Sequence, residues 1–325
     1  MPDHGFTRAN GALITALMAR RGLLGALLGG GLAASLTPTA ARAATAETAV
    51  NTPTRYIETG GRRLAYRSIG TGRPVVLCTR FRGTIDDWDP LFLDSLIVQG
   101  FRVITFDYSG LGLSTGEKSL NPFAWAKDAN ALVDALELKS VVLLGWSLGG
   151  IAAQAALSIF PEKISHLVLV GTTPPGPAVK LSEPLFYQTA ARENDFEDEV
   201  ILFFEPKSPA SRAAAKASHD RIAARRTDRA PPVPYQWAAA NLGDRPKAEP
   251  FPAPPILALL KSTSIPILHI GGDHDLVCPV ENWYALNDQL PTLQLLTYPN
   301  AGHGPQHQHP VSSAAHIGVF VQSAD

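Results

Sequence analysis

The stretch that decides the fold reads GWSLGG at residues 145–150. An apolar run, VVLL at 141–144, precedes it, and the alanine-rich segment IAAQAAL follows it at 151–157. These neighbours predict that a buried strand turns into a helix at Ser147. In a G-x-S-x-G pattern the two glycines relieve crowding around a sharp, strained turn that exposes the serine hydroxyl. The pattern therefore predicts a nucleophilic serine, and a glycine-rich turn at the end of a core strand is the alternative.

Strands and helices are expected to alternate on both sides of this turn. Continuous apolar runs lie at 74–79, 101–106, 140–145, 166–171 and 266–271, with segments of helical spacing between them at 88–98, 123–136, 148–160 and 283–289. Such runs suit strands that are covered on both faces, as in a parallel sheet. A hairpin turning at Gly60-Gly61 precedes them, and a strand at 293–298 and a helix at 310–322 follow. The sequence predicts an α/β fold with a doubly wound, mostly parallel sheet of eight strands.

Residues 175–262 interrupt this alternation, because they contain no clear strand run. Alanine, arginine and glutamate favour helices there, and proline-rich stretches favour linkers between the helices. We expect a helical lid inserted at the C-terminal edge of the sheet, with the core formed by 44–174 and 263–325. A purely structural helical excursion is the alternative.

The first 43 residues differ from the rest in character. Arg20-Arg21 precede a glycine-rich apolar stretch at 22–36, which is too short and too weakly apolar to cross a bilayer as a helix. Ala41-Arg42-Ala43 then gives the small-x-small pattern that a signal peptidase accepts. We expect residues 1–43 to be a cleaved export signal of the twin-arginine type, and the protein to be periplasmic or secreted. An amphipathic or disordered extension is the alternative.

Composition narrows the class of partner. The 325 residues carry a formal net charge of −1, with 45% hydrophobic and 18% charged residues. Since neither sign is in excess and no Lys/Arg run is interleaved with aromatics, neither nucleic acid nor an anionic membrane surface is an expected partner. The two cysteines, Cys78 and Cys278, fall beside predicted strand ends and are expected as buried thiols. A disulfide between them is the alternative.

A serine hydroxyl needs a base to remove its proton near pH 7. His303, in YPNAGHGP, follows the last predicted strand and is expected to reach back across the edge of the sheet. His307 and His309 lie close by in sequence, and an HxxxHxH cluster could also suggest a metal site. Because no further carboxylate or cysteine ligand is near in sequence, no metal is expected.

The histidine in turn needs a carboxylate that fixes its tautomer and stabilises the imidazolium. Asp275, in GGDHDLVCP, follows the strand predicted at 266–271, and Asp273 in the same motif is the competing choice. The chain order Ser147, Asp275, His303 is the order in which the serine, acid and histidine follow one another in proteins whose nucleophilic serine lies in a strand–turn–helix motif.

Four motifs together resemble those of the α/β-hydrolase superfamily: GWSLGG, FDYSGLGLS at 106–114, GGDHDLVCP and AGHGP. The resemblance runs from about Arg55 to the C-terminus and is to the compact, serine-nucleophile kind with one helical lid. In that family the acid is the fourth residue of a G-x-x-D-x-x-x-P pattern, which begins here at Gly272 and selects Asp275. The resemblance also implies that Asp107 anchors its loop and takes no part in the reaction.

The sequence departs from the family pattern at two places. Where relatives have His-Gly before an oxyanion donor, this chain has Thr79, Arg80 and Phe81. Because a backbone donor does not depend on the side chain, the amides of Phe81 and Leu148 are expected to form the oxyanion hole. Ser109 stands where relatives often have arginine, so an internal salt bridge of the family is expected to be missing.

The resemblance implies an esterase, a lactonase or a cofactor-free haloperoxidase-like enzyme. We expect a carboxylic ester hydrolase, with a catalytic triad, that cleaves an ester or lactone of a small, largely apolar molecule through an acyl-enzyme, and no cofactor is required. The alternatives are a carbon–carbon bond hydrolase, a haloperoxidase or perhydrolase, and a non-catalytic binding protein. The expected pocket is apolar, with four candidate substrate contacts: Arg80, Trp146, Phe204 and Trp237. Arg80 could bind a substrate carboxylate, pair with a nearby acid or point to solvent.

Overall fold

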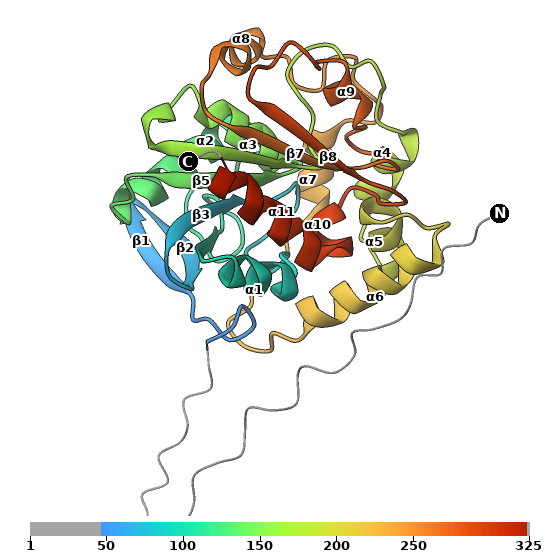
Figure 1. Cartoon of the computed structure of the whole chain (residues 1–325). Coiled ribbons are helices and arrows are strands. Elements are labelled where there is room, and N and C mark those ends of the chain that lie inside the picture. Colours follow the sequence, from blue (N-terminus) through green and yellow to red (C-terminus); the bar gives the residue numbers. More distant parts are fainter. Residues whose placement is uncertain (1–46, 324–325) are drawn as a thin grey trace, which may run out of the picture. The chain divides into compact units, whose positions relative to one another are not determined.

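An eight-stranded sheet runs through the protein, and the computed structural model describes it within residues 47–323 (Figure 1). The strands are β1 (Arg55–Thr59), β2 (Arg62–Ile69), β3 (Arg73–Cys78), β4 (Phe101–Phe106), β5 (Val141–Trp146), β6 (Ile164–Val170), β7 (Ile267–Gly272) and β8 (Leu293–Tyr298). Their spatial order is β1-β2-β4-β3-β5-β6-β7-β8. β2 is antiparallel to both β1 and β4, and the other pairs are parallel. The predicted mostly parallel α/β sheet is confirmed.

Helices cover both faces of the sheet. α1 (Pro90–Val98) and α11 (Pro310–Ser323) lie side by side on one face, and α2 (Pro122–Ala135) and α3 (Leu148–Ala156) pack together on the other (Figure 1). Alternate residues of one strand serve the two faces, as the pleat requires. Val142 and Leu144 of β5 join the core beneath α1 and α11, whereas Val141 and Leu143 join the core beneath α2 and α3. Burial on both faces explains why the strands read as unbroken apolar runs.

Short helical segments complete the core. They are η1 (Pro161–Lys163), α9 (Glu281–Tyr284) and α10 (Pro305–Gln308). The helix expected at 283–289 is therefore only the four residues of α9. Cys78 is buried, Cys278 is half-buried, and both are free thiols, so the alternative of a disulfide is wrong.

Five helices lie between β6 and β7 in the described chain: α4 (Pro184–Ala190), α5 (Phe196–Phe203), α6 (Pro209–Ala223), α7 (Tyr235–Leu242) and α8 (Pro254–Ser262). Three of them, α4, α6 and α8, begin with proline, whose missing N–H is not needed in the first helical turn. Prolines thus start these helices as well as separating them. That the segment works as a lid stays a prediction.

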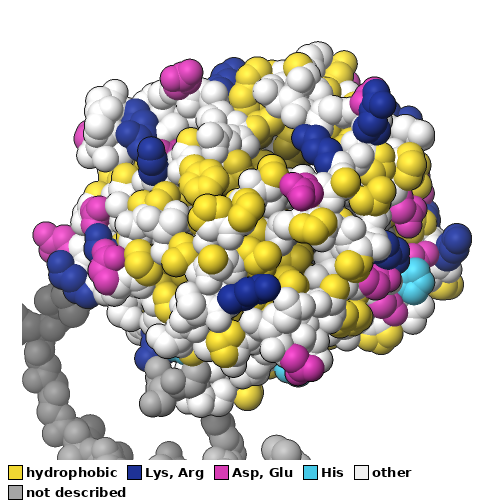
Figure 2. Space-filling view, turned by 90° about the horizontal axis from the view of Figure 1, so that it is seen from above, with side chains coloured by type: hydrophobic (Ala, Val, Ile, Leu, Met, Phe, Trp, Pro, Cys, Tyr) yellow, Lys and Arg dark blue, Asp and Glu magenta, His cyan; other side chains and the backbone are white. Residues whose placement is uncertain are grey.

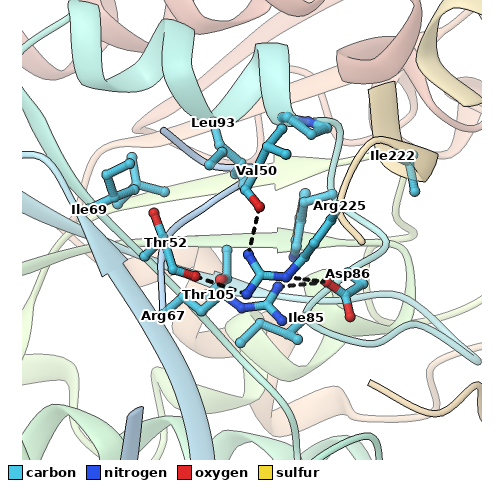
Figure 3. Close-up of a pocket in the computed structure, with 14 residues that line it drawn as sticks. Val50, Thr52, Arg67, Ile69, Ile85, Asp86, Leu93, Thr105, Ile222 and Arg225 are labelled. Atoms are coloured by element: carbon cyan, nitrogen blue, oxygen red, sulfur yellow. Dashed lines mark hydrogen bonds and ion pairs between the residues drawn. The ribbon is translucent and has the colours of Figure 1, made fainter. Parts of the chain in front are cut away.

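Two arginines attach α6 to the core. The guanidinium of Arg221 donates two hydrogen bonds, of 2.8 and 2.6 Å, to the carboxylate of Asp89 at the start of α1. Arg225, just beyond the end of α6, donates to the carbonyl oxygens of Val50 (3.0 Å) and Thr52 (2.9 Å) beside a cavity of about 20 Å³ (Figure 3). These bonds join the segment before β1 to the helical insertion, and Arg225 itself is buried.

The predicted export signal, residues 1–43, lies outside the described residues and stays a prediction. Within residues 47–323, no helix has the length and apolarity that a bilayer span requires. On the face seen in Figure 2, basic and acidic side chains lie among hydrophobic ones, and some of both signs lie close together near its edge.

Candidate active site

Ser147 lies in the turn between β5 and α3, in a strained backbone conformation. Its φ is 57° and its ψ is −123°, a region that a non-glycine residue occupies at a cost of about 1–3 kcal/mol. The neighbouring backbone holds it there, because the Ser147 amide donates to the carbonyl of Val170 (2.9 Å). The hydroxyl of Thr172 donates to the Ser147 carbonyl at 2.7 Å. The predicted strand–serine–helix turn is therefore present.

The two glycines of the motif permit close backbone contacts around Ser147. A Cβ atom on Gly145 would lie 2.3 Å from the carbonyl oxygen of Gly149. A Cβ on Gly149 would lie 2.2 Å from the carbonyl oxygen of Cys78, at the end of β3. Only glycine allows α3 to start this close to β3 and β5.

Three side chains from three loops at this sheet edge form a hydrogen-bonded chain. The Nε2 atom of His303 lies 2.8 Å from the Oγ atom of Ser147. Its Nδ1 atom lies 3.0 and 2.9 Å from the two carboxylate oxygens of Asp275. All three residues are buried, with exposed fractions of 7% for Ser147, 2% for His303 and 4% for Asp275. The three residues expected as nucleophile, base and acid thus come together.

Asp275, not Asp273, is the carboxylate beside His303. Burial by itself would raise the pKa of Asp275, but the charge of His303 and its hydrogen bonds outweigh this and hold the pKa below its usual value. The amides of Val277 and Cys278 add one hydrogen bond each, at 2.8 Å. Asp273 instead lies 2.7 Å from Nδ1 of the neighbouring His274. The carboxylate of Asp275 is therefore held ionised where a tautomer of His303 must be fixed.

The other two histidines of the HxxxHxH cluster face different partners. The Nε2 atom of His307 accepts a hydrogen bond from the amide of Asp89 (3.3 Å), and burial lowers its pKa to about 4. The ring of His309 stacks on Tyr298 with 4.4 Å between centroids. Among the residues that the structure describes, no group of three His, Cys, Asp or Glu side chains could hold a metal ion.

The amides expected to form the oxyanion hole flank Ser147. Leu148 is the first residue of α3, so its N–H has no partner inside the helix. Phe81 lies in the loop after β3 and lines both cavities that open at Ser147. Within residues 47–323 neither N–H donates to another backbone group, so both are available to an oxyanion.

Asp107 anchors the loop that carries Phe81. Its carboxylate accepts from the amides of Ile85 (2.6 Å) and Leu113 (2.8 Å), which belong to two different loops. Burial raises its pKa to about 7. These contacts fit the anchoring role expected for Asp107.

Ser109, the second departure from the family pattern, lies beside an ion pair that comes from another strand. Arg62 of β2 forms an ion pair of 2.6 Å with Asp128, and its Nε atom lies 2.6 Å from the hydroxyl of Ser109. No salt bridge can come from residue 109 itself, which is a serine, and that expectation stays a prediction about the family pattern. The charge of Asp128 is instead paired with Arg62, and the Ser109 hydroxyl donates to the same carboxylate at 2.8 Å.

Two cavities open on either side of Ser147 and have different linings. The larger, of about 520 Å³, is lined mainly by apolar side chains. The smaller, of about 290 Å³, is lined by His303 and by several charged and amide side chains. Phe81, Phe186 and Val277 line both cavities. The expected apolar pocket is thus only half of the site, because the other half is polar.

The four predicted substrate contacts lie in different places. Arg80 lines the smaller cavity, where it forms an ion pair of 2.8 Å with Asp87. Of the three aromatic residues, Trp146 and Phe204 line a separate cavity of about 180 Å³ beside α6. Trp237 packs against the core, and none of the three lines either of the two cavities described at Ser147.

Three residues near Ser147 were not singled out from the sequence as substrate contacts. Phe186 was one of several aromatics in the insertion, and Val277 lies inside the motif that carries Asp275. Arg82 follows the oxyanion loop and carries no sequence signal of its own, yet its side chain lines the smaller cavity. Its place becomes evident only once α4 and α5 are folded against that loop.

Comparison with known proteins identifies relatives of the whole core. Residues 73–310 match the family model described as alpha/beta hydrolase fold. A solved alpha/beta hydrolase fold protein from Chitinophaga pinensis is 31% identical, with a TM-score of 0.73 over 85% of this chain and 100% of that one. A Mycobacterium tuberculosis protein named as a non-heme bromoperoxidase, BpoC, is 26% identical over 74% of this chain and 90% of its own length. The 2-hydroxymuconate semialdehyde hydrolase of a Pseudomonas species is 26% identical over 69% and 77%.

Proposed function

The chain belongs to the alpha/beta hydrolase fold family, and from that premise we propose that it is a serine hydrolase of esters or lactones. One observation carries the proposal. Oγ of Ser147 lies 2.8 Å from Nε2 of His303, whose Nδ1 lies 2.9 Å from the Asp275 carboxylate. A base within hydrogen-bonding reach of a strained serine, oriented by a buried carboxylate, is the arrangement that activates a hydroxyl for acyl transfer.

In the first half of the reaction Ser147 attacks the substrate carbonyl as His303 takes the hydroxyl proton. The developing oxyanion is stabilised by the amides of Phe81 and Leu148. Within the described residues, neither of these N–H groups donates a hydrogen bond to another backbone group. The positive end of α3 adds to this stabilisation. His303 then gives its proton to the leaving oxygen, and the bond from that oxygen to the carbonyl carbon breaks.

In the second half a water molecule replaces the leaving group. His303 removes one proton from the water, the resulting hydroxide attacks the acyl carbon, and the tetrahedral intermediate collapses. The proton returns to Ser147 Oγ as the acid is released. Asp275 fixes the tautomer of His303 and stabilises its imidazolium form in both halves.

The leaving group belongs on the side of Ser147 that His303 lines, because His303 must reach the leaving oxygen. That side is the smaller cavity, so the acyl group belongs in the larger, mainly apolar one. A polar cavity around the leaving group favours an alcohol over a carbon leaving group. This supports ester or lactone cleavage with an apolar acyl part.

The second candidate is cleavage of a carbon–carbon bond next to a carbonyl group. It is favoured by the 26% identity to 2-hydroxymuconate semialdehyde hydrolase. A haloperoxidase or perhydrolase reaction would use the same serine. The 26% identity to the relative named as a bromoperoxidase supports this reaction as a further alternative. Rates on a p-nitrophenyl ester and on a vinylogous 1,5-diketone, measured on one preparation, separate the ester and carbon–carbon candidates.

The test of the proposal is hydrolysis of short p-nitrophenyl esters together with labelling by a fluorophosphonate. We expect turnover and covalent labelling of Ser147, both lost in Ser147→Ala without loss of folding by circular dichroism. Ser262→Ala, on the surface of α8, is the control and should retain both. If the intact protein shows neither turnover nor labelling, it is a non-catalytic binding protein instead.

We further propose that the protein is exported before it acts. The support is the sequence of residues 1–43 alone, with its paired arginines and its small-x-small site.

A further inference from the structure

The smaller cavity beside Ser147 is unusual for a pocket that handles a neutral ester, because its wall carries five charged side chains. They are Arg80, Arg82, Asp87, Glu193 and Glu199. The larger cavity has a single charged residue in its lining, Lys247. The charge of the smaller cavity is therefore a feature of the leaving-group side.

Two of its three carboxylates already have partners. Asp87 lies 2.8 Å from the guanidinium of Arg80. Glu199 lies 2.8 Å from Nδ1 of His219 on α6. Glu193 is exposed to solvent, which screens its charge. Of the three acidic side chains that line the smaller cavity, two are thus in ion pairs and the third is exposed to solvent.

Arg82 has no such partner. Its Nη1 atom donates to three neutral oxygens at 2.9 Å each: the carbonyls of Ala190 and Arg192 and the side chain of Asn194. No carboxylate in residues 47–323 lies within ion-pair distance of it, and its Nε and Nη2 atoms make no hydrogen bond there. Burial lowers its pKa and the charge of Arg80 lowers it further, while the charges of Asp87 and Glu193 oppose this shift without cancelling it.

The position of Arg82 is fixed rather than adjustable. Its φ of 57° is a conformation that residues other than glycine rarely adopt, and the three bonds to the end of α4 and the following loop hold the side chain. Arg82 lines the cavity, and its Nε and Nη2 donors have no hydrogen-bond partner among the described residues. A guanidinium with two such donors can hydrogen-bond the two oxygens of a carboxylate or another oxyanion.

We propose that Arg82 determines substrate specificity, and that the preferred substrates are esters whose alcohol part carries a carboxylate or similar anion. The assignment rests on the proposed ester hydrolysis, which places the alcohol part in the cavity lined by His303 and Arg82. Arg82 binds the anion on the leaving group, while the apolar acyl part occupies the larger cavity.

The experiment compares three hexanoate esters whose leaving phenols carry a meta substituent of different charge. They are the esters of 3-hydroxybenzoate (anionic), 3-hydroxybenzamide (neutral) and 3-hydroxyphenyltrimethylammonium (cationic), and kcat/KM is measured for each. Ratios of each variant to the wild type cancel the chemical reactivity of the esters. We expect Arg82→Gln to lower kcat/KM for the anionic ester about tenfold relative to the neutral one.

Two further variants separate charge from structure. Arg82→Lys should retain part of the preference for the anionic ester, since it keeps the charge and loses the planar fork. Arg226→Gln removes a positive charge from an exposed residue that lines neither cavity at Ser147, and it should leave the ratio unchanged. If Arg82→Gln loses activity on all three esters, wild-type enzyme in rising salt is the second readout. The anionic preference should then fall as ionic strength screens the guanidinium.

The outcomes distinguish this inference from the proposed function. Hydrolysis of all three esters with an unchanged ratio in Arg82→Gln overturns the role of Arg82 and leaves the serine hydrolase intact. A preference that does not respond to salt also counts against it. Absence of hydrolysis of every ester by the wild type contradicts the proposed function itself.

Discussion

The indole Nε1 of Trp146 donates a hydrogen bond of 2.7 Å to the backbone carbonyl of His303. The residue before the nucleophile thus holds the loop that carries the base. The ring also lies 4.7 Å from that of His307 and is buried, with an exposed fraction of 1%. Trp146 therefore positions His303, and it does not line a cavity with Ser147.

We predict that Trp146→Phe lowers kcat and leaves KM unchanged. The variant removes the donor, and the His303 carbonyl left buried without a partner costs about 1–3 kcal/mol of unfolding free energy. A shift of His303 costs about ten- to hundredfold in kcat. Steady-state kinetics and urea unfolding measure both effects, and Trp237→Phe is the matched control. A rise in KM at constant kcat would instead indicate a substrate contact.

The two aspartates of one motif should differ sharply in effect. Asp275→Asn removes the charge that orients His303, and kcat should fall by about 10³- to 10⁴-fold. Asp273→Asn changes a half-exposed carboxylate that lies beside His274, so kcat should change by less than about threefold. The pair is compared by turnover of a p-nitrophenyl ester. Equal losses in both variants would show that the carboxylate beside His303 is dispensable.

Gly149→Ala should prevent normal folding of the serine turn. The added methyl group would lie 2.2 Å from the carbonyl of Cys78, which is backbone and has no easy route to move. We expect a loss of more than about 3 kcal/mol in unfolding free energy. Gly61→Ala, at a hairpin position with open space and a φ of 75°, should cost only about 1–2 kcal/mol. Similar denaturation midpoints for the two variants would contradict the steric argument.

Acid should destabilise the protein partly through His307. Burial holds its pKa at about 4, below the ordinary value of 6.5, so the unfolded chain binds the proton first as the pH falls. Between about pH 6.5 and pH 4 the unfolded chain binds one proton more at this residue than the folded protein does. The unfolding free energy should therefore fall as the pH decreases through this range. His307→Gln keeps an acceptor for the Asp89 amide without titrating, and its dependence on pH should be shallower. The exposed His316→Gln should behave as wild type, and identical slopes in all three would refute the assignment.

Export can be tested by replacing Arg20-Arg21 with Lys-Lys in a bacterium with a twin-arginine pathway. We expect the protein to stay inside the cytoplasm in the variant and to leave it in the unaltered form, as followed by cell fractionation. An export signal read by another route would tolerate the change.

The sheet and the reactive centre were predictable because each rests on a local pattern. The runs that became β3 to β7 are apolar over their whole length, and the turn at Ser147 needs glycines on both sides. The motifs after β7 and β8 then placed Asp275 and His303 at the same edge, since parallel strands end together.

The charged half of the site was not predictable in this way. Arg82, Glu193 and Glu199 come from a loop and from the helical insertion, and they meet only through long-range packing. The ion pair of Arg62 with Asp128 was missed for a similar reason, because its two residues are 66 positions apart. Sequence distance hides contacts that depend on how separate elements dock.

The bonds from Arg225 to the carbonyls of Val50 and Thr52 bear on how the enzyme should be produced. A recombinant form that begins at Ala44 keeps both acceptors, whereas one trimmed to Arg55 leaves the buried guanidinium with only its longer ion pairs, to Asp86 (3.5 Å) and Asp228 (3.6 Å). Such trimming should weaken the attachment of α6 to the core. It should also make the wall of the cavity lined by Glu199 and His219 less rigid. A purification tag is therefore best placed at the C-terminus or well before Val50, where it does not disturb the hydrogen bonds of Arg225.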